Sequence, residues 1–301
     1  MVSNLEKAKI LTQALPFIKR YHGKTIVIKY GGSAMTDQKI KEQFIQDVVL
    51  MKFVGINPVV VHGGGPEINA MLEKIGKESR FVEGNRVTDL ETVEIVEMIL
   101  SGKVNKDLVS NINRHGGRAI GLSGKDDNMI LVEKKFIEKD GETIDIGYVG
   151  EIKEINTDII DMLDFNNYIP VISTIGVDKE GQTYNINADY VAGEIAGKIK
   201  ADRLIFLTDV DGIMQDHTNK ETLISDITRK EVERLIENGT ISGGMLPKVE
   251  TCLHALKKGV ENVIILNGKI EHSILLELFT EEGAGTLIKE NKTQEDITWK
   301  Q

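Results

Sequence analysis

The sequence predicts an α/β protein with a mainly parallel central sheet, and three features along the chain lead to that prediction. Short runs of apolar and β-branched residues recur, glycines or a turn follow each run, and a segment with helical spacing comes next. This alternation is typical of parallel sheets, in which a helix carries the chain from the end of one strand to the start of the next. We expect strands at residues 25–29, 58–62, 118–122, 169–173, 204–208 and 262–266.

Helices are expected between these strands. After the first strand, apolar residues are spaced four, four and three apart at Ile40, Phe44, Val48 and Met51, so one face of a helix must lie on the sheet. Further helices are expected at residues 66–75, 90–100, 188–199, 230–237 and 248–257.

Two segments depart from the parallel pattern. Residues 129–149 are expected to form short antiparallel strands around the turn pair Asp140 and Gly141. The first twenty residues predict an amphipathic helix, which Pro16 should kink near its end. The apolar face of that helix carries Leu5, Ala8, Leu11, Leu15 and Ile18.

Composition and charge limit the possible functions. The 301 residues, 41% of them hydrophobic, suffice for one large domain or two closely joined lobes. A net charge of −10 leaves no broad basic surface for nucleic acid or for an anionic membrane. Cys252 is the only cysteine, which excludes an internal disulfide and argues against a cysteine-based metal site. Because the sequence has neither a signal peptide nor an apolar run of about 18 residues, we expect a soluble cytoplasmic protein.

Two glycine-rich turns follow strands that should be neighbours. Lys29 ends the first strand and glycines follow at 31–32, while the second strand precedes glycines at 63–65 and Pro66, which suits a first helical turn. Such turns expose backbone N–H groups at helix N-termini, where the helix dipole favours an anion. One such turn is most often only a tight turn. Two at adjacent strands, one with a lysine, indicate an anion site at the carboxyl edge of the sheet.

Familiar nucleotide-binding motifs do not account for this site. Residues 23–25 resemble the end of a P-loop, but Ile18 stands where that loop requires glycine and the triplet precedes its strand. The TDVDG run at 208–212 resembles a calcium loop, yet Ile213 occupies a liganding position. A strand-end turn beside a nucleotide is the better interpretation of that run.

Six motifs, in this order and at these spacings, resemble those of the amino acid kinase family. They are KYGGSA from Lys29, VHGGGPEIN from Val61, FVEGNRVTD from Phe81, YNINADYVAG from Tyr184, LTDVDGI from Leu207 and GGMLPKVE from Gly243. The resemblance covers essentially the whole chain and points to the branch that phosphorylates N-acetyl-L-glutamate. It implies a three-layer αβα sandwich, transfer of the γ-phosphoryl group of ATP to the side-chain carboxylate, and Mg²⁺ bound with ATP.

The resemblance also implies an arrangement of lobes and a set of site residues. Residues 1–22 would form an oligomerisation helix, 23–187 an acetylglutamate-binding and dimerisation lobe, and 188–301 a nucleotide-binding lobe. The implied catalytic residues are two lysines that touch the transferring phosphoryl group and a carboxylate that holds both, namely Lys29, Lys248 and Asp189.

Further residues are implied for the two substrates. The acceptor would be held by backbone donors at Gly32, Gly64 and Gly65. Arg86 and Asn185 would bind its amino-acid end, although Asn187, two residues further on, could be confused with Asn185. The adenine and ribose edge of the nucleotide would lie along Thr208, Asp209, Val210, Asp211, Gly212 and Ile213.

The reaction itself explains why lysines and glycines are needed. A carboxylate acceptor with a pKa of about 4.3 is already ionised at pH 7, so no general base is required. The difficulty lies in bringing an anion to a triphosphate, which calls for preorganised positive charge and in-line positioning.

Each singled-out residue also has a simpler explanation. Asp189 would suit the first turn of any helix, and Arg86 could be a surface ion-pair partner of Glu83 or Asp89. Lys248 taken alone is an ordinary solvated lysine. His62 ends a buried strand and is expected to be a satisfied core histidine without a chemical role.

Two alternative functions stay open on the sequence. One is another kinase of the same family, acting on glutamate, aspartate, carbamate or uridylate. The other is a catalytically dead amino-acid sensor on the same scaffold, which would be expected to lack one of the lysines or the carboxylate.

A regulatory hypothesis rests on the two ends of the chain. The apolar face of the first helix either lies on its own lobe or pairs with the same helix of another subunit. The run at 272–288 is either an exposed turn or a site for a guanidinium. Resemblance to the arginine-inhibited branch implies a homo-oligomer, either a dimer or a hexamer of three dimers, with L-arginine near Tyr21, His272, Glu281 and Gly285.

Overall fold

The computed structural model describes residues 3–139, 141–216 and 219–291. Its centre is an eight-stranded sheet in the order β12-β14-β13-β11-β1-β2-β8-β5. All neighbouring strands are parallel except β13 and β14, which run antiparallel. The strands are β1 Thr25–Tyr30, β2 Asn57–His62, β5 Ala119–Ser123, β8 Ile169–Ser173, β11 Arg203–Thr208, β12 Asp226–Thr228, β13 Asn262–Asn267 and β14 Thr286–Lys289. The six strands expected from the sequence are all present, each within one residue of its expected bounds.

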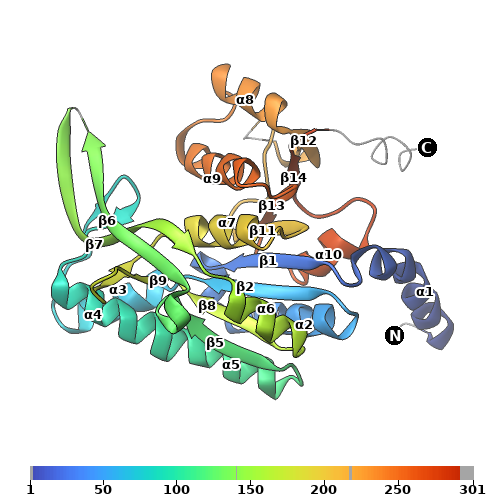
Figure 1. Ribbon diagram of the computed structural model, residues 1–301. Coiled ribbons are helices and arrows are strands. Elements are labelled where there is room, and N and C mark those ends of the chain that lie inside the picture. The colour runs from blue at the N-terminus through green and yellow to red at the C-terminus, as the bar shows by residue number, and fades with distance from the viewer. Residues whose placement is uncertain (1–2, 140, 217–218, 292–301) are drawn as a thin grey trace.

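Helices cover both faces of this sheet, which confirms the three-layer αβα architecture (Figure 1). Side chains alternate along each central strand, so Ile26 and Ile28 of β1 face one helical layer and Val27 faces the other. The first layer contains α2 Gln38–Phe53, α3 Gly65–Lys74, α4 Leu90–Glu97, α5 Asn105–Arg114 and α10 Ser273–Phe279. The second contains α6 Asp158–Phe165, α7 Ala188–Lys198, α8 Arg229–Glu237 and α9 Leu246–Lys257.

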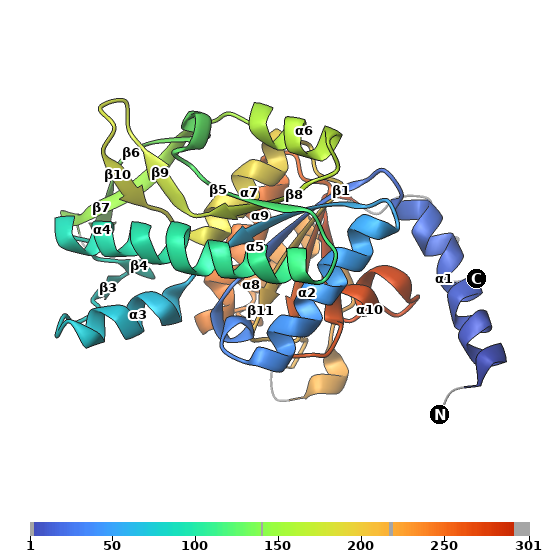
Figure 2. The same ribbon diagram turned by 90° about the horizontal axis from the view of Figure 1, so that it is seen from below.

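The helix expected at 90–100 is longer than the sequence predicted. A π-helical stretch over Met98–Val104 joins α4 to α5, so that one continuous rod crosses the first layer, as Figure 2 shows. The spacing of apolar residues changes at this stretch because a π turn inserts an additional residue per turn. Helices α5 and α6 were not predicted from the sequence.

Residues 129–149 contribute to an antiparallel hairpin, as expected. It consists of β6 Ile130–Lys139 and β7 Glu142–Ile155, and Figure 1 shows it projecting from one end of the molecule. The expected turn residue Asp140 lies outside the described residues. With β9 Ile175–Val177 and β10 Thr183–Asn185, the hairpin closes a small barrel beside the main sheet. A separate two-stranded ribbon is formed by β3 Phe81–Val82 and β4 Asn85–Arg86.

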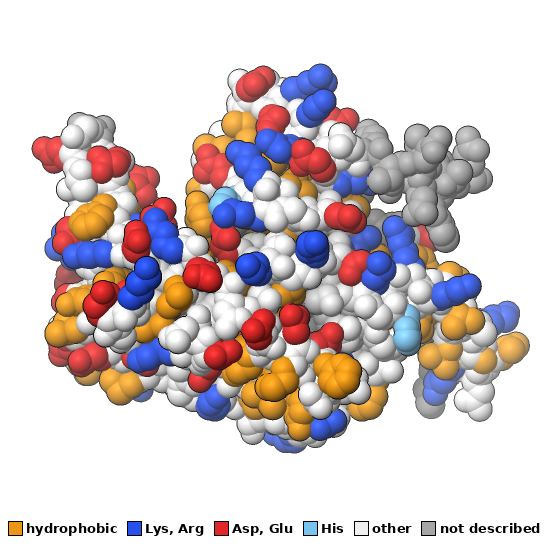
Figure 3. All heavy atoms as spheres, viewed as in Figure 1, with side chains coloured by type: hydrophobic (Ala, Val, Ile, Leu, Met, Phe, Trp, Pro, Cys, Tyr) orange, Lys and Arg blue, Asp and Glu red, His pale blue; other side chains and the backbone are white. Residues whose placement is uncertain are grey.

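The amino-terminal helix α1 spans Asn4–Tyr21 and begins with a capping box formed by Ser3 and Glu6. It continues through Pro16 for five further residues. Much of its apolar face is left uncovered by the described residues, since Leu5, Leu11 and Leu15 are each at least 60% exposed. Figure 3 shows apolar side chains at the surface over this helix. None of the helices in the described ranges combines the length and apolar composition that a membrane span requires.

Candidate active site

Two cavities meet at the carboxyl ends of β1, β2 and β11, and four residues line both of them. The first cavity, of about 250 Å³, lies between the ends of β1, β11 and helix α9. The second, of about 240 Å³, lies beneath the β3–β4 ribbon and beside the three-glycine turn. The residues common to the two linings are Lys29, Gly31, Gly32 and Asp189. A group lying at this junction would therefore face both cavities.

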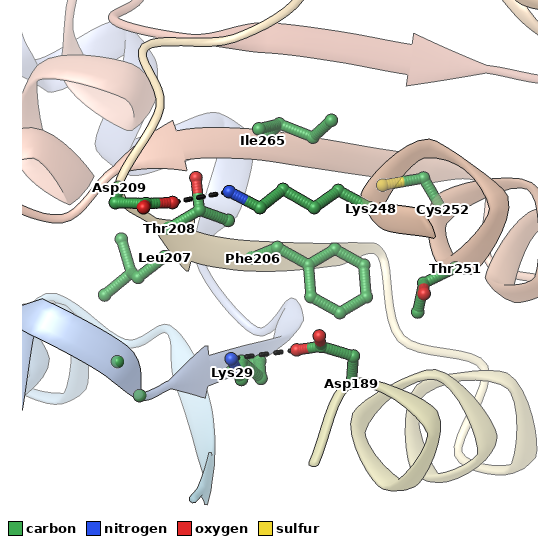
Figure 4. A pocket seen from close by; sticks show the side chains of 12 residues that line it. Lys29, Asp189, Phe206, Leu207, Thr208, Asp209, Lys248, Thr251, Cys252 and Ile265 are labelled. Atoms are coloured by element: carbon green, nitrogen blue, oxygen red, sulfur yellow. Dashed lines mark hydrogen bonds and ion pairs between the residues drawn. The ribbon is translucent and has the colours of Figure 1, made fainter. Parts of the chain in front are cut away.

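Lys29 is placed at the junction by the central strand. Its neighbours in register are Phe206 of β11 and Val61 of β2, and only 14% of its side chain is exposed. Its Nζ lies 2.9 Å from Oδ1 of Asp189, which stands in the first turn of α7. The ion pair orients the lysine across the junction, as Figure 4 shows.

Lys248 reaches the first cavity from the opposite wall. It lies near the start of α9, after Pro247, and its Nζ forms an ion pair with Asp209 at the end of β11 (Figure 4). The hydrogen bond from Lys248 lowers the pKa of Asp209. The sequence-based expectation that Asp189 holds both lysines is therefore not what the structure shows, because each lysine has its own carboxylate. The residues Phe206, Thr251, Cys252 and Ile265 complete much of this wall.

The two glycine turns form the floor between the cavities. Gly32 has a φ of +65°, which favours glycine, and it opens a 3-10 turn over Gly32–Met35. Gly64 precedes α3, and a Cβ there would lie 2.6 Å from Cδ2 of Leu100. A Cβ at Gly65 would instead meet no other atom within 4 Å, because this residue faces open space. The turn after β2 thus brings the backbone to the cavity wall, and a side chain at Gly64 would collide with Leu100.

Arg86 lies in the wall of the second cavity and is only 7% exposed. Its Nη1 donates to the Ser79 hydroxyl at 2.5 Å, and its guanidinium lies 4.7 Å from the centre of the Phe81 ring. The surface ion pairs considered for it from the sequence do not form, because Glu83 pairs with Lys139 and Asp89 pairs with Lys77. Within the described part of the chain, no carboxylate is within ion-pair distance of Arg86. Burial lowers the pKa of this guanidinium.

The two candidate asparagines have different surroundings. The side-chain oxygen of Asn187 accepts hydrogen bonds from the backbone N–H groups of Asp189 and Tyr190 and so caps α7. Asn185, at the end of β10, also lines the cavity and is not used as a helix cap. Both asparagines thus line the second cavity, and the side chain of Asn187 is the one that caps a helix.

In the segment from Thr208 to Ile213, only the first residues line the first cavity, and the last is buried in the core. Thr208 and Asp209 line the first cavity, whereas the other four predicted nucleotide residues do not. Asp211 accepts a hydrogen bond from Asn267, and the N–H of the buried Ile213 donates to Thr286. The sequence analysis missed Thr251 and Cys252, although both lie one helical turn after Lys248 and share its face. That spacing is the signal that would have identified them.

Of the four residues named for L-arginine, two line the same cavity. Tyr21 and Glu281 line a separate cavity of about 190 Å³ between α1, α10 and the start of β12, together with Arg20, Arg203 and Glu277. His272 lines a different cavity, where its Nδ1 lies 2.6 Å from Oδ1 of the buried Asp47 of α2. Gly285 does not line the cavity, but its N–H donates to Glu277, which does.

The chain matches known proteins over most of its length. Residues 24–267 match the sequence profile of the amino acid kinase family. The chain belongs to the amino acid kinase family. It is 57% identical over 293 residues to acetylglutamate kinase of Methanocaldococcus jannaschii, a match that covers 96% of this chain and 98% of the relative. It is 55% identical over 288 residues to acetylglutamate kinase of Desulforamulus reducens, with coverage of 96% and 99%.

A solved structure shows that the fold is shared more widely. N-acetylglutamate synthase of Neisseria gonorrhoeae superposes with a TM-score of 0.82 at 24% sequence identity. The superposition covers 95% of this chain and 64% of the synthase. At this identity the similarity concerns the fold alone. As in other open α/β sheets, the cavities here lie at the carboxyl ends of the parallel strands.

Proposed function

We propose that this protein transfers the γ-phosphoryl group of ATP to the side-chain carboxylate of N-acetyl-L-glutamate, the step expected of an acetylglutamate kinase in arginine biosynthesis. The observation that carries the proposal is the shared lining of the two cavities. Lys29 and the glycine turn lie where a donor in one cavity and an acceptor in the other would meet. High identity to acetylglutamate kinases over nearly the full chain supports the choice of acceptor.

The second cavity suits an acceptor with two carboxylates and no free ammonium group. Arg86 is a buried cation without a carboxylate partner in the described chain, so a ligand carboxylate would remove an uncompensated charge. Asn185 lines the same cavity, where its side-chain amide would bond an acetamido group. Apolar side chains of Ile68, Leu100 and Val149 in the same lining leave room for a methyl group. A free amino acid would need a carboxylate for its ammonium group, and the carboxylate in this lining, that of Asp189, is already paired with Lys29.

In the proposed reaction, an oxygen of the acceptor carboxylate attacks the γ-phosphorus. A new O–P bond forms, the bond to the bridging oxygen breaks, and ADP leaves with that electron pair. The acceptor is already ionised at neutral pH, so no side chain has to remove a proton. Lys29 and Lys248 would neutralise the charge that spreads over the transferring group, and the N–H groups of the glycine turns would bind its oxygens.

Mg²⁺ fits the donor set of the first cavity. The carboxylates of Asp189 and Asp209 line it, and oxygen ligands of this kind, with phosphates and water, suit Mg²⁺. Among the described residues, no three His, Cys, Asp or Glu side chains come together as a metal site, so most ligands would come from ATP. When bound, Mg²⁺ would offset negative charge on the phosphates.

A coupled assay of ADP release tests the proposal. The intact protein would be offered ATP and Mg²⁺ with N-acetyl-L-glutamate, and in parallel with glutamate, aspartate or carbamate. We expect turnover with the acetylated substrate at a kcat/KM at least about 100-fold above the others. The buried ammonium group of glutamate or aspartate would be unpaired, and carbamate lacks the second carboxylate and the acetamido group proposed to bind Arg86 and Asn185. Preference for a free amino acid, or ADP release independent of acceptor, would refute the proposal.

A finer proposal concerns regulation by L-arginine in the cavity lined by Tyr21 and Glu281. That cavity contains the carboxylates of Glu277, Glu281 and Glu282 and the guanidinium groups of Arg20 and Arg203. A ligand that carries both a guanidinium and a carboxylate complements this mixed lining. Calorimetric titration with L-arginine should show binding that Glu281→Gln weakens and that the exposed control Glu142→Gln preserves. Equal binding by both variants would exclude Glu281 from the site.

The same region suggests a homo-oligomer. The uncovered apolar face of α1 would be covered if the helix paired with that of another subunit. Because α1 also supplies Tyr21 to the arginine cavity, oligomer formation and arginine binding would be linked. Light scattering of the intact chain would measure the oligomeric state.

A further inference from the structure

A buried polar cluster lies directly beneath the three-glycine turn. His62, the last residue of β2, is fully buried and is placed beside Ser173 of β8. Its Nδ1 is 2.8 Å from the carbonyl oxygen of Gly63, and its Nε2 is 3.0 Å from Nδ2 of Asn105. Both ring nitrogens are satisfied, as expected from the sequence for a core histidine. The partner on one side, however, is the backbone of the proposed anion-binding turn.

The partners determine which tautomer is present. A carbonyl oxygen can only accept, so Nδ1 of His62 must carry the proton that it donates to Gly63. The Asn105 amide also donates to the Val171 carbonyl at 2.9 Å, and its Oδ1 accepts from Lys106 at 3.2 Å, which fixes the orientation of the amide. Nε2 of His62 is therefore the acceptor. Burial lowers the pKa of His62 to about 4, so the ring stays neutral at physiological pH.

This hydrogen bond sets the direction of the next N–H group. The carbonyl of Gly63 and the N–H of Gly64 belong to one peptide unit, and in a trans peptide they point in opposite directions. The N–H of Gly63 is itself held by the Tyr30 carbonyl at 3.0 Å. With the Gly63 carbonyl turned down toward the core, the Gly64 N–H is directed up toward the cavity. Hydrogen bonds thus hold both the N–H and the carbonyl group of Gly63.

The space around the cluster leaves little freedom for the turn to move. A Cβ at Gly121 of β5 would lie 1.8 Å from Oδ1 of Asn105, so a larger residue at that position is incompatible with this amide. Asn105 is the first residue of α5, and through His62 and Val171 it joins that helix to the ends of β2 and β8. The cluster connects elements far apart in sequence at the edge where the site lies.

We propose that His62 is a positioning residue for phosphoryl transfer, which acts by holding the Gly63 carbonyl so that the Gly64 N–H faces the transferring group. The inference rests on the proposed kinase activity. His62 lines neither of the two cavities, so its removal should affect the rate of the chemical step more than binding of either substrate. Donors of this kind contribute chiefly in the transition state.

A pair of variants separates the donor from the rest of the side chain. In His62→Asn, Nδ2 can occupy the place of Nδ1 and keep the bond to Gly63, whereas His62→Leu has similar size and no donor. Both lose the contact with Asn105. We expect kcat of His62→Leu to fall by about 10- to 100-fold with little change in KM for ATP, and His62→Asn to recover most of that loss.

Ser173→Ala is the matched control. Ser173 is as deeply buried at the same sheet edge, and its hydroxyl bonds that of Ser101 at 3.0 Å without touching the glycine turn. It should lower the melting temperature and leave kcat near that of the parent. Unchanged kcat in His62→Leu, or equal losses in the Leu and Asn variants, would overturn the inference. Absence of turnover in the parent protein would instead refute the proposed kinase function.

A measurement on the unaltered protein covers the case in which His62→Leu does not fold. Nitrogen-15 NMR of protein labelled in its histidines distinguishes a protonated from an unprotonated ring nitrogen. We expect His62 to show protonated Nδ1 and unprotonated Nε2 from about pH 6 to about pH 8, since its pKa is about 4. The opposite tautomer, with an unprotonated Nδ1, would remove the hydrogen bond to Gly63 and with it the inference.

Discussion

Replacement of Arg86 by lysine is the most direct test of how the second cavity recognises its ligand. In the structure the guanidinium is buried, donates to Ser79 and lies over the Phe81 ring. Lysine retains the charge but loses the planar pair of donors that matches a carboxylate. The proposed acceptor should therefore bind with one charge-assisted hydrogen bond fewer, while ATP should bind as before.

The magnitude follows from the contacts that are lost. A hydrogen bond to a charged group contributes about 1.5–3 kcal/mol to binding. The cation–π contact with Phe81 contributes about 0.5–1 kcal/mol by holding the guanidinium in its orientation. Part of this is recovered by the lysine ammonium, so we expect a net loss of about 1.5–3 kcal/mol. Since about 1.4 kcal/mol corresponds to tenfold, KM for N-acetyl-L-glutamate should rise by roughly 10- to 100-fold.

Initial-rate kinetics with both substrates varied would measure this effect. Arg80→Lys is the matched control, because Arg80 lies in the same segment and its side chain is exposed. That control should leave both KM values within about twofold, as is usual for surface changes. Equal increases in KM for ATP and for the acceptor in Arg86→Lys would mean that Arg86 is not part of the acceptor site.

Three further predictions concern other parts of the structure. Lys29→Ala and Lys248→Ala should each lower kcat by about 10²- to 10³-fold with smaller effects on KM, and near-full kcat in either would remove that lysine from the reaction. Deletion of residues 1–20 should leave an active enzyme of lower oligomeric state with a weaker response to L-arginine, and an unchanged mass in light scattering would show that α1 does not join subunits. The folded-state pKa of His62, about 4, is below its ordinary value of 6.5, so the unfolded state takes up a proton first as the pH falls. The free energy of unfolding should therefore drop by about 3 kcal/mol between about pH 6.5 and about pH 4 through this residue, and His62→Asn should show a correspondingly smaller acid-induced decrease in denaturant titrations.

The central sheet was predictable because its signals are local. Each of the six expected strands is an apolar run that ends in a turn, and a buried parallel strand needs no long-range information to be recognised. The edge strand β12 is only three residues long and was missed, since three residues give no period to detect. The π-helical stretch after α4 was also missed, because the apolar pattern there follows a different spacing from that of an α-helix.

The sequence did not reveal how the charged side chains of the candidate site pair with one another. Lys29, Lys248 and Asp189 do line one cavity, yet the partner of Lys248 is Asp209 from another strand end. Pairing of this kind depends on how α9 is placed against β11, which no local pattern specifies. The same holds for His272, whose partner Asp47 lies on a helix 225 residues earlier in the chain.

The two ion pairs explain how an acidic chain can receive a triphosphate. In the absence of ATP, Lys29 and Lys248 are held by Asp189 and Asp209, so neither cation is left uncompensated in a partly buried cavity. A phosphate oxygen that arrives exchanges one anionic partner for another, and the lysine side chains are already ordered. The entropic cost of fixing two long side chains is thus met during folding and not during the reaction. The carboxylates have a second consequence, since their negative charge disfavours phosphate wherever the lysines do not offset it. In the proposed complex the triphosphate would therefore lie in the first cavity, whose lining contains both lysines together with Gly31 and Gly32.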